Sequence, residues 1–224
     1  MKNTPFIAVT SQPVPYHADT TAIFNTLCQQ NSNSLLLDSA EIGSKNSLQS
    51  LILINAAVKI TCLGNQVTFR ALNANGRQVL NEIHPVLSQL GTISAVNFEN
   101  EFSVQFAPLD NQLDEDSKLQ AATIFDGLRV ISNHYQHSST PVFLGGLFAY
   151  DLVTNFIPMH GVELKDDGIN CPDYSFYLAE NLITIDHQSQ QATLKSFCFS
   201  QEEQVEVAKT ALSIAQKLRN IDGV

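Results

Sequence analysis

His134 and His137 stand three residues apart, a spacing that can bring two imidazoles together near the end of a helix. A zinc site needs three or four ligands, and no cysteine or acidic cluster accompanies this pair. We therefore expect both to be surface residues at a helix C-terminus, where the helix dipole favours histidine. The other histidines are isolated and lie mostly near loops, so we expect structural rather than catalytic roles for them: His17, His84, His160 and His187.

Asp151 is a second candidate for chemistry, because it follows an apolar segment that contains Gly145 and Gly146. Without a partner, it is better explained as a strand end or a helix cap. The sequence contains no G-x-S-x-G pattern, no Walker loop and no G-x-G-x-x-G after a predicted strand. We therefore predict no catalytic residue and no metal site in this chain.

The composition limits the classes of partner. The formal net charge is -10, with 12 Lys and Arg against 22 Asp and Glu, which argues against nucleic acid as a partner. No run of 18 apolar residues is present, so no membrane span is expected, and residues 1–11 do not resemble a signal peptide. The four cysteines are far apart, which favours free thiols in the cytoplasm, with Cys28 and Cys62 in the core.

Apolar periodicity predicts the elements that must position any site. Helices are expected over 19–30 with Asp19 as its cap, 75–90, 117–135 and a last helix after 200–203. Strands are expected over 34–39 (buried), 51–72 (a hairpin turning at 64–65), 94–106, 141–150, and 174–186 with 191–199 (a second hairpin). Residues 114–116 are expected to be a solvated helix start, and residues 159–167 a surface loop.

The last helix has the clearest signals. Ser200 and Glu203 form the pattern S-x-x-E, which predicts a capping box. Its predicted apolar face consists of Val205, Ala208, Leu212, Ala215 and Leu218. Together with the hairpins, this mixture predicts an α+β fold of mostly antiparallel sheet with helices packed against it.

Four segments resemble the N-terminal region of anthranilate synthase component I. They are LLLDSAEIGSKNSLQSLILINAAVKITCLGNQVTFRAL (35–72), LDEDSKLQAATIFDGLR (113–129), FLGGLFAYDLV (143–153) and NCPDYSFYLAENLITIDHQ (170–188). They occur in the right order with compatible spacing, so the resemblance covers nearly the whole chain. It implies that residues 1–224 are the N-terminal regulatory domain, and that the C-terminal chorismate-utilising domain is absent from this chain.

The family converts chorismate and ammonia to anthranilate and pyruvate in tryptophan biosynthesis. A glutamine amidotransferase subunit, component II, supplies the ammonia. Chorismate and Mg²⁺ bind in the C-terminal domain, so the resemblance implies a lyase only in the full-length enzyme. It implies no cofactor in this chain, and an isolated chain without activity.

The resemblance also implies a feedback site for L-tryptophan. The family pattern L-L-E-S is similar to Leu36-Leu37-Asp38-Ser39, which points to Leu37, Asp38 and Ser39 as tryptophan-binding residues. A carboxylate can offset the ammonium of the amino acid, and apolar neighbours can take the indole. Asp38 replaces the usual Glu, and Gln49 replaces a Lys of close relatives that helps to hold the effector.

Two further residues match the family pattern and are expected to support the site. Arg129 is expected to form an ion pair within the domain or between domains, and Cys171 is expected to be a buried thiol. Two alternatives remain open at this stage: the equivalent region of para-aminobenzoate synthase component I, and a free-standing amino-acid-binding or scaffold domain. The extended match ILINAAVKITCLG (52–64) favours anthranilate synthase.

Overall fold

The computed structural model of the protein describes residues 5–29, 31–38, 48–97, 99–108, 114–136, 140–155 and 171–221. Its strands are β1 (Ala8–Val14), β2 (Leu35–Asp38), β3 (Gln49–Leu63), β4 (Gln66–Ala71), β5 (Thr92–Asn97), β6 (Glu101–Gln105), β7 (Leu144–Phe148), β8 (Tyr174–Asp186) and β9 (Gln191–Cys198). Its helices are α1 (Thr20–Cys28), α2 (Ala74–Leu87), α3 (Glu115–Gln120), α4 (Asp126–His134), the 3-10 helix η1 (Tyr150–Asn155) and α5 (Gln204–Arg219).

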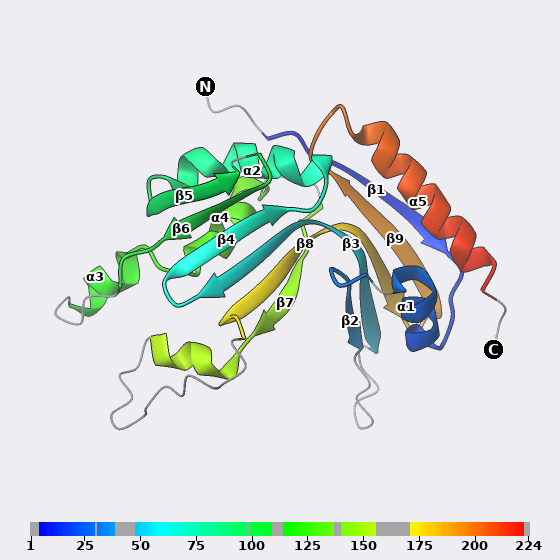
Figure 1. The fold of residues 1–224 in the computed structure, drawn as a ribbon. Coiled ribbons are helices and arrows are strands. Elements are labelled where there is room, and N and C mark those ends of the chain that lie inside the picture. The colour runs from blue at the N-terminus through cyan, green and yellow to red at the C-terminus, as the bar shows by residue number, and fades with distance from the viewer. Residues whose placement is uncertain are drawn as a thin grey trace.

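All nine strands belong to one curled sheet, and every pairing within it is antiparallel (Figure 1). The strand order is β1-β9-β8-β3-β4-β6-β5, with β2 added to β3 and β7 added to β8. The predicted α+β fold is therefore confirmed. Both predicted hairpins are confirmed as β3-β4 and β8-β9.

The long strands β3 and β8 pair along their whole length and form the spine of the sheet. Their outer neighbours change halfway along. The first half of β3 pairs with β2 and the second half with β4, while the first half of β8 pairs with β7 and the second half with β9. The register between β3 and β8 shifts between Leu53 and Val58, where one half of the sheet passes into the other.

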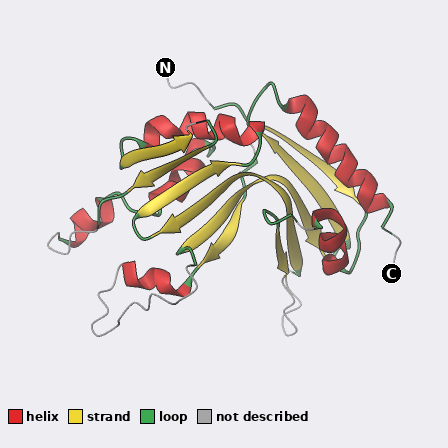
Figure 2. Ribbon diagram, viewed as in Figure 1, coloured by secondary structure: helices red, strands yellow, loops and turns green. Residues whose placement is uncertain are grey.

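Each half of the sheet has its own helices and its own core (Figure 2). Helices α1 and α5 pack beside β9, β1 and the first half of β3, over buried residues that include Ile23, Ile52, Ile183, Ile214 and Leu218. Helices α2 and α4 pack beside the other half, over buried residues that include Phe69, Val79, Phe102, Ile131 and Tyr135. Cys28 and Cys62 are buried, as predicted.

The predicted helix over 117–135 is wrong as one element, because it is two helices separated by residues 121–125. The backbone of Ala121 is extended. Asp126 closes a turn with Thr123, since its N–H donates to the Thr123 carbonyl at 2.8 Å and its carboxylate accepts the Thr123 N–H at 2.7 Å. The apolar spacing runs on through this turn, so periodicity alone did not reveal the break. Asp114 caps α3 by accepting from Ser117 N–H at 2.7 Å, which agrees with the predicted helix start.

The signals at the last helix misplaced its cap and part of its buried face: Ala215 and Leu218 are buried as predicted, whereas Val205, Ala208 and Leu212 are exposed. Helix α5 begins at Gln204, and its N-cap residue Glu203 makes no side-chain capping bond. The Ser200 hydroxyl instead accepts from Glu202 N–H at 3.3 Å. The buried residues are Val207, Ala211, Ile214, Ala215 and Leu218, whereas Val205 and Leu212 are 66% and 59% exposed.

Two strands differ from expectation. Strand β2 is half exposed rather than buried, because it is a short strand whose one strand partner among the described residues is β3. Strand β1 was missed because its residues alternate weakly and include Pro13, which suits the sheet edge it occupies beside β9. The backbones of β7 and β8 approach closely at Gly146, where a Cβ would lie 2.1 Å from the Ser175 carbonyl oxygen. The loop expected over 159–167 lies outside the described residues.

Candidate functional site

The predicted tryptophan-binding residues lie where β2 meets the start of β3. In the antiparallel register, Asp38 faces Ser50 and Leu37 faces Leu51. Leu37 is 40% exposed and Asp38 is also exposed. Ser39, the third predicted residue, lies outside the described residues. The structure therefore brings Leu37 and Asp38 to one exposed strand end.

Leu37 and Asp38 point to opposite faces of the sheet, because side chains alternate along a strand. Asp38 shares its face with Ser50, and Leu37 shares the other face with Leu51 and with Gln49. The outer edge of β2 has no strand partner among the described residues. A ligand that touches both Leu37 and Asp38 must therefore lie across this edge rather than flat on one face.

A groove follows the same edge. Its volume is about 450 Å³ and it is lined by Leu36, Leu37, Asp38, Gln49 and Leu51. Three of the five lining residues are leucines, and the one carboxylate comes from Asp38. Gln49 reaches the groove from β3, at the position where the family resemblance placed a ligand-holding Lys. The groove can therefore offer an apolar wall and one acidic group to a small ligand.

A chain of hydrogen bonds leads from the Asp38 carboxylate into the protein. The Ser50 hydroxyl donates to Oδ1 of Asp38, and the Ser50 side chain is fully buried. Nε2 of His187 lies 2.8 Å from the Ser50 Oγ, and Nδ1 of His187 lies 3.2 Å from the hydroxyl oxygen of Tyr16. Sequence analysis missed Ser50 as a functional residue and treated His187 as isolated.

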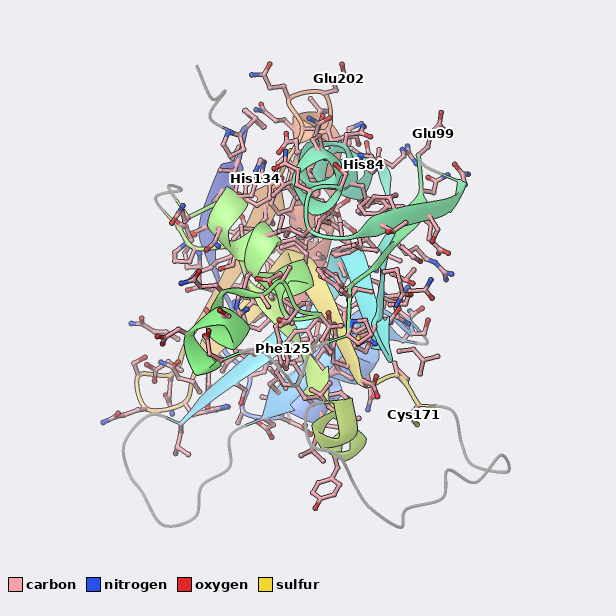
Figure 3. All side chains as sticks on the ribbon, turned by 90° about the vertical axis from the view of Figure 1, so that its left-hand side faces the viewer. His84, Glu99, Phe125, His134, Cys171 and Glu202 are labelled. Atoms are coloured by element: carbon pink, nitrogen blue, oxygen red, sulfur yellow. The ribbon has the colours of Figure 1, made fainter. Side chains whose placement is uncertain are left out.

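The two supporting residues lie in other parts of the molecule. Arg129 is on α4, where it pairs with Asp126 at 3.2 Å and its guanidinium lies 6.0 Å from the centre of the Phe125 ring. It therefore makes a local ion pair within the described residues. Cys171 was expected to be buried, and this is wrong, because it is exposed beside the start of β8 (Figure 3).

Of the two histidines near the end of α4, the structure describes His134. His134 ends α4, as predicted, but it is not simply a surface residue, since it is 22% exposed and Nε2 lies 2.9 Å from the Glu82 carboxylate of α2. It thus joins two helices (Figure 3). His137 lies outside the described residues. Asp151 lies in η1 rather than at a strand end, and nothing is described of its side chain. Among the described residues, no group of three or more His, Cys, Asp or Glu is placed to hold a metal ion.

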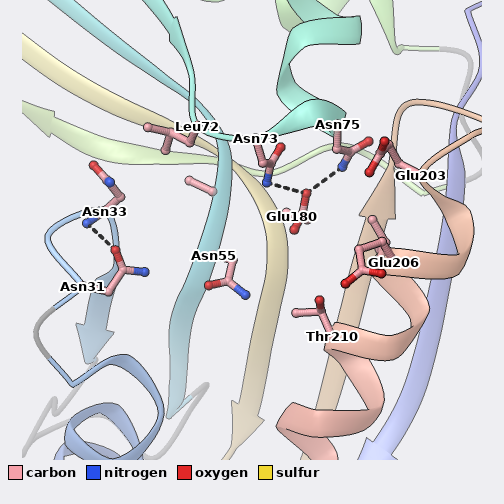
Figure 4. Close-up of a pocket in the computed structure, with 12 residues that line it drawn as sticks. Asn31, Asn33, Asn55, Leu72, Asn73, Asn75, Glu180, Glu203, Glu206 and Thr210 are labelled. Carbon is pink, nitrogen blue, oxygen red and sulfur yellow. Dashed lines mark hydrogen bonds between the residues drawn. The ribbon is translucent and has the colours of Figure 1, made fainter. Parts of the chain in front are cut away.

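A second pocket, of about 320 Å³, lies where the first turn of α2 meets β8 and α5 (Figure 4). Its floor is Glu180 of β8, which is only 6% exposed. Oε2 of Glu180 accepts from the side-chain amides of Asn73 at 2.8 Å and Asn75 at 2.9 Å. Burial raises the pKa of Glu180, and the two Asn hydrogen bonds oppose that rise.

The pocket floor is a structural joint between α2 and the sheet. Asn75 also donates to the Phe197 carbonyl at 3.0 Å and accepts from Phe199 N–H at 2.6 Å. Gly76 allows this close approach, because a Cβ there would lie 1.9 Å from the Ala57 carbonyl oxygen. A charged residue inside the apolar segment YLAENLITI is the sequence signal that could have revealed Glu180.

Comparison with known proteins finds relatives that share one name. No family model matches it. It is 84% identical over 219 residues to anthranilate synthase component 1 of Haemophilus influenzae, covering 98% of this chain and 42% of that protein. The proteins of the same name from Vibrio cholerae and Escherichia coli K12 are 44% and 36% identical over 89% and 88% of this chain.

The chain corresponds to the N-terminal region of anthranilate synthase component 1. It spans about 42% of the length of the Haemophilus influenzae relative and 38% and 37% of the other two. The chain is therefore similar to one region of these relatives and not to the whole of them. No helix among the described residues is long and apolar enough to cross a membrane.

Proposed function

We propose that this chain is the tryptophan-sensing N-terminal region of a full-length anthranilate synthase component 1, in which it regulates anthranilate formation from chorismate. The observation that supports the enzyme is the 84% identity to a protein of that name over 98% of the chain. The name component 1 also supports a component 2 partner, the glutamine amidotransferase that supplies ammonia. Chorismate and Mg²⁺ then belong to the remaining part of the enzyme. We therefore expect no anthranilate, measured by its fluorescence, from the isolated chain.

The β2 edge supports the regulatory part of the proposal. Free tryptophan carries an ammonium, a carboxylate and an indole. Asp38 can accept hydrogen bonds from the ammonium, while the leucines of the groove contact part of the ring. The four cysteines are free thiols, which is consistent with a location in the cytoplasm, a reducing compartment.

The groove supplies only part of the surface that an indole needs. Burying about 150–250 Å² of an aromatic side chain is worth roughly 4–6 kcal/mol, and micromolar affinity requires about 8 kcal/mol in total. Because Leu37 is 40% exposed, an indole lying on this edge keeps much of its surface in water. We infer that the second wall of the site comes from the remaining part of the full-length enzyme.

Titration calorimetry with L-tryptophan tests this division of the site. The isolated chain should bind no tighter than about 1 mM, which corresponds to roughly -4 kcal/mol, and the full-length enzyme should bind at micromolar concentration. Micromolar binding by the isolated chain would show that the pocket is complete within it. No binding by either protein would overturn the regulatory proposal.

A further inference from the structure

Four residues from separate parts of the chain form a series of contacts that ends at one carboxylate oxygen of Asp38 in the candidate effector site. Tyr16 precedes α1, His187 follows β8, Ser50 lies in β3, and Asp38 ends β2. Contacts link them in this order: Tyr16 to His187 at 3.2 Å, His187 to Ser50 at 2.8 Å, and Ser50 to Asp38. Tyr16 and His187 also meet edge to face, with ring centres 5.8 Å apart. Of these four residues, Asp38 lines the groove, and the other three lie behind it.

The direction of each hydrogen bond follows from the number of protons available. An ionised carboxylate only accepts, so the single Ser50 hydroxyl proton points to Asp38. The contact between Ser50 and His187 then needs a proton on Nε2 of His187. In a neutral imidazole, this leaves Nδ1 as an acceptor, which takes the hydroxyl proton of Tyr16. All three protons therefore point toward Asp38, and His187 is held in one tautomer.

The backbone holds this chain of donors in place. The backbone N–H of His187 donates to the Leu48 carbonyl at 2.9 Å, which holds the backbone of His187 beside the start of β3. Ser50 is paired with Asp38 on one side and with Ile185 of β8 on the other. Among the described residues, Ser50 is the one donor to the Asp38 carboxylate. Asp38 itself is exposed, so within the described residues the Ser50 hydrogen bond is the contact that orders its carboxylate.

We propose that Tyr16, His187 and Ser50 are positioning residues that orient the Asp38 carboxylate for the ammonium group of an α-amino acid. The inference rests on the proposed tryptophan site and identifies what tunes it. Ser50 holds Oδ1, and this leaves Oδ2 of the carboxylate to accept from the ligand. Orientation matters here because a carboxylate that is already ordered loses less entropy when the ligand binds.

Two substitutions of His187 separate a positioning role from a packing role. The Gln amide can place an N–H near the position of Nε2, so His187→Gln keeps a donor to Ser50, whereas His187→Leu has a similar size and no donor. The test is inhibition of ammonia-dependent anthranilate formation by L-tryptophan in the full-length enzyme. Each curve is normalised to the uninhibited rate of its own variant. Indole-3-propionate, which has the indole and carboxylate but no ammonium, is the second inhibitor.

We expect Ser50→Ala to raise the half-inhibiting tryptophan concentration by about 10-fold, the usual effect of losing a hydrogen bond to a charged group. His187→Leu should raise it by about fivefold, because it removes the neutral hydrogen bond that orients the Ser50 hydroxyl. His187→Gln should stay within about threefold of the wild type. Inhibition by indole-3-propionate should change less than about twofold in all three variants, since Asp38 has no ammonium to meet.

The contradicting results are distinct. If His187→Gln and His187→Leu weaken tryptophan equally, or if indole-3-propionate weakens in parallel with tryptophan, the residues act through packing and the inference is wrong. If Asp38→Asn leaves tryptophan inhibition unchanged, the proposed tryptophan site itself is wrong. If Asp38→Asn relieves inhibition while Ser50→Ala does not, only the positioning role fails.

Discussion

At the scale of single residues, whether a candidate site residue could be predicted depends on how far its partners lie along the chain. Leu37 and Asp38 could be selected from sequence because the L-L-x-S pattern is local. Ser50 and His187 could not, because they are 137 residues apart and meet only in the folded sheet. The prediction that Cys171 is buried was wrong, because a match to a family pattern does not determine burial, and this thiol is exposed. A local motif thus selected the candidate site, and tertiary hydrogen bonds add Ser50 and His187 to it.

Glu180 gives a prediction on how stability depends on pH. Burial raises its pKa above the ordinary value of 4.5, so the folded state holds the proton more tightly than the unfolded state. The stability from this group is therefore full below pH 4.5 and is lost as the pH rises through the folded pKa. Glu180→Gln keeps an acceptor for Asn73 and Asn75 but carries no charge. The free energy of unfolding of Glu180→Gln, relative to that of the wild type, should therefore increase from acid to neutral pH. The increase should be about 1.4 kcal/mol for each unit by which folding raises the pKa of Glu180.

Urea unfolding from pH 4 to 8 measures this difference. Glu206→Gln is the matched control, because it removes the same charge from the rim of the same pocket, where the side chain is 68% exposed. A difference between Glu180→Gln and wild type that stays constant over this range would contradict the prediction.

At the scale of elements, alternation along strands was more informative than periodicity along helices. The β3-β4 and β8-β9 hairpins followed from β-rich runs and their turns. Periodicity did not detect the turn at 121–125, because the apolar spacing continues through it. On α5, periodicity predicted a buried face that contains Leu212. The helix has apolar residues on two sides, and packing against β9 determines which side is buried.

Helix α5 offers a matched pair of substitutions that checks its buried face. Leu218 is 1% exposed in the core shared with α1, whereas Leu212 is 59% exposed. Leu218→Ala should lower the free energy of unfolding by about 2–5 kcal/mol, because it removes buried methyl groups and leaves a cavity. Leu212→Ala should change it by no more than about 0.5 kcal/mol. Chemical denaturation of both variants tests this, and equal losses would mean that the packed face is wrongly assigned.

At the scale of the whole molecule, the β3-β8 spine joins two halves that have separate cores. The effector groove and the donors behind it belong to the half that contains β2, α1 and α5, whereas Glu180 anchors α2 of the other half. The groove lies at an exposed sheet edge, which suits a site that a second part of the protein must close. This placement supports the proposed role of a regulatory region that works only beside a catalytic one.

Tryptophan inhibition of the full-length enzyme, measured for wild type and Asp38→Asn, tests the central proposal most directly. Asp38→Asn removes the charge that meets the ligand ammonium, so the half-inhibiting concentration should rise at least about 10-fold, as expected for a lost charge-assisted hydrogen bond. Asp19→Asn is the matched control, because it removes one negative charge elsewhere in the same half and leaves a residue that still caps α1. Its curve should overlay the wild type. Equal inhibition of all three proteins would mean that tryptophan is not bound at the β2 edge.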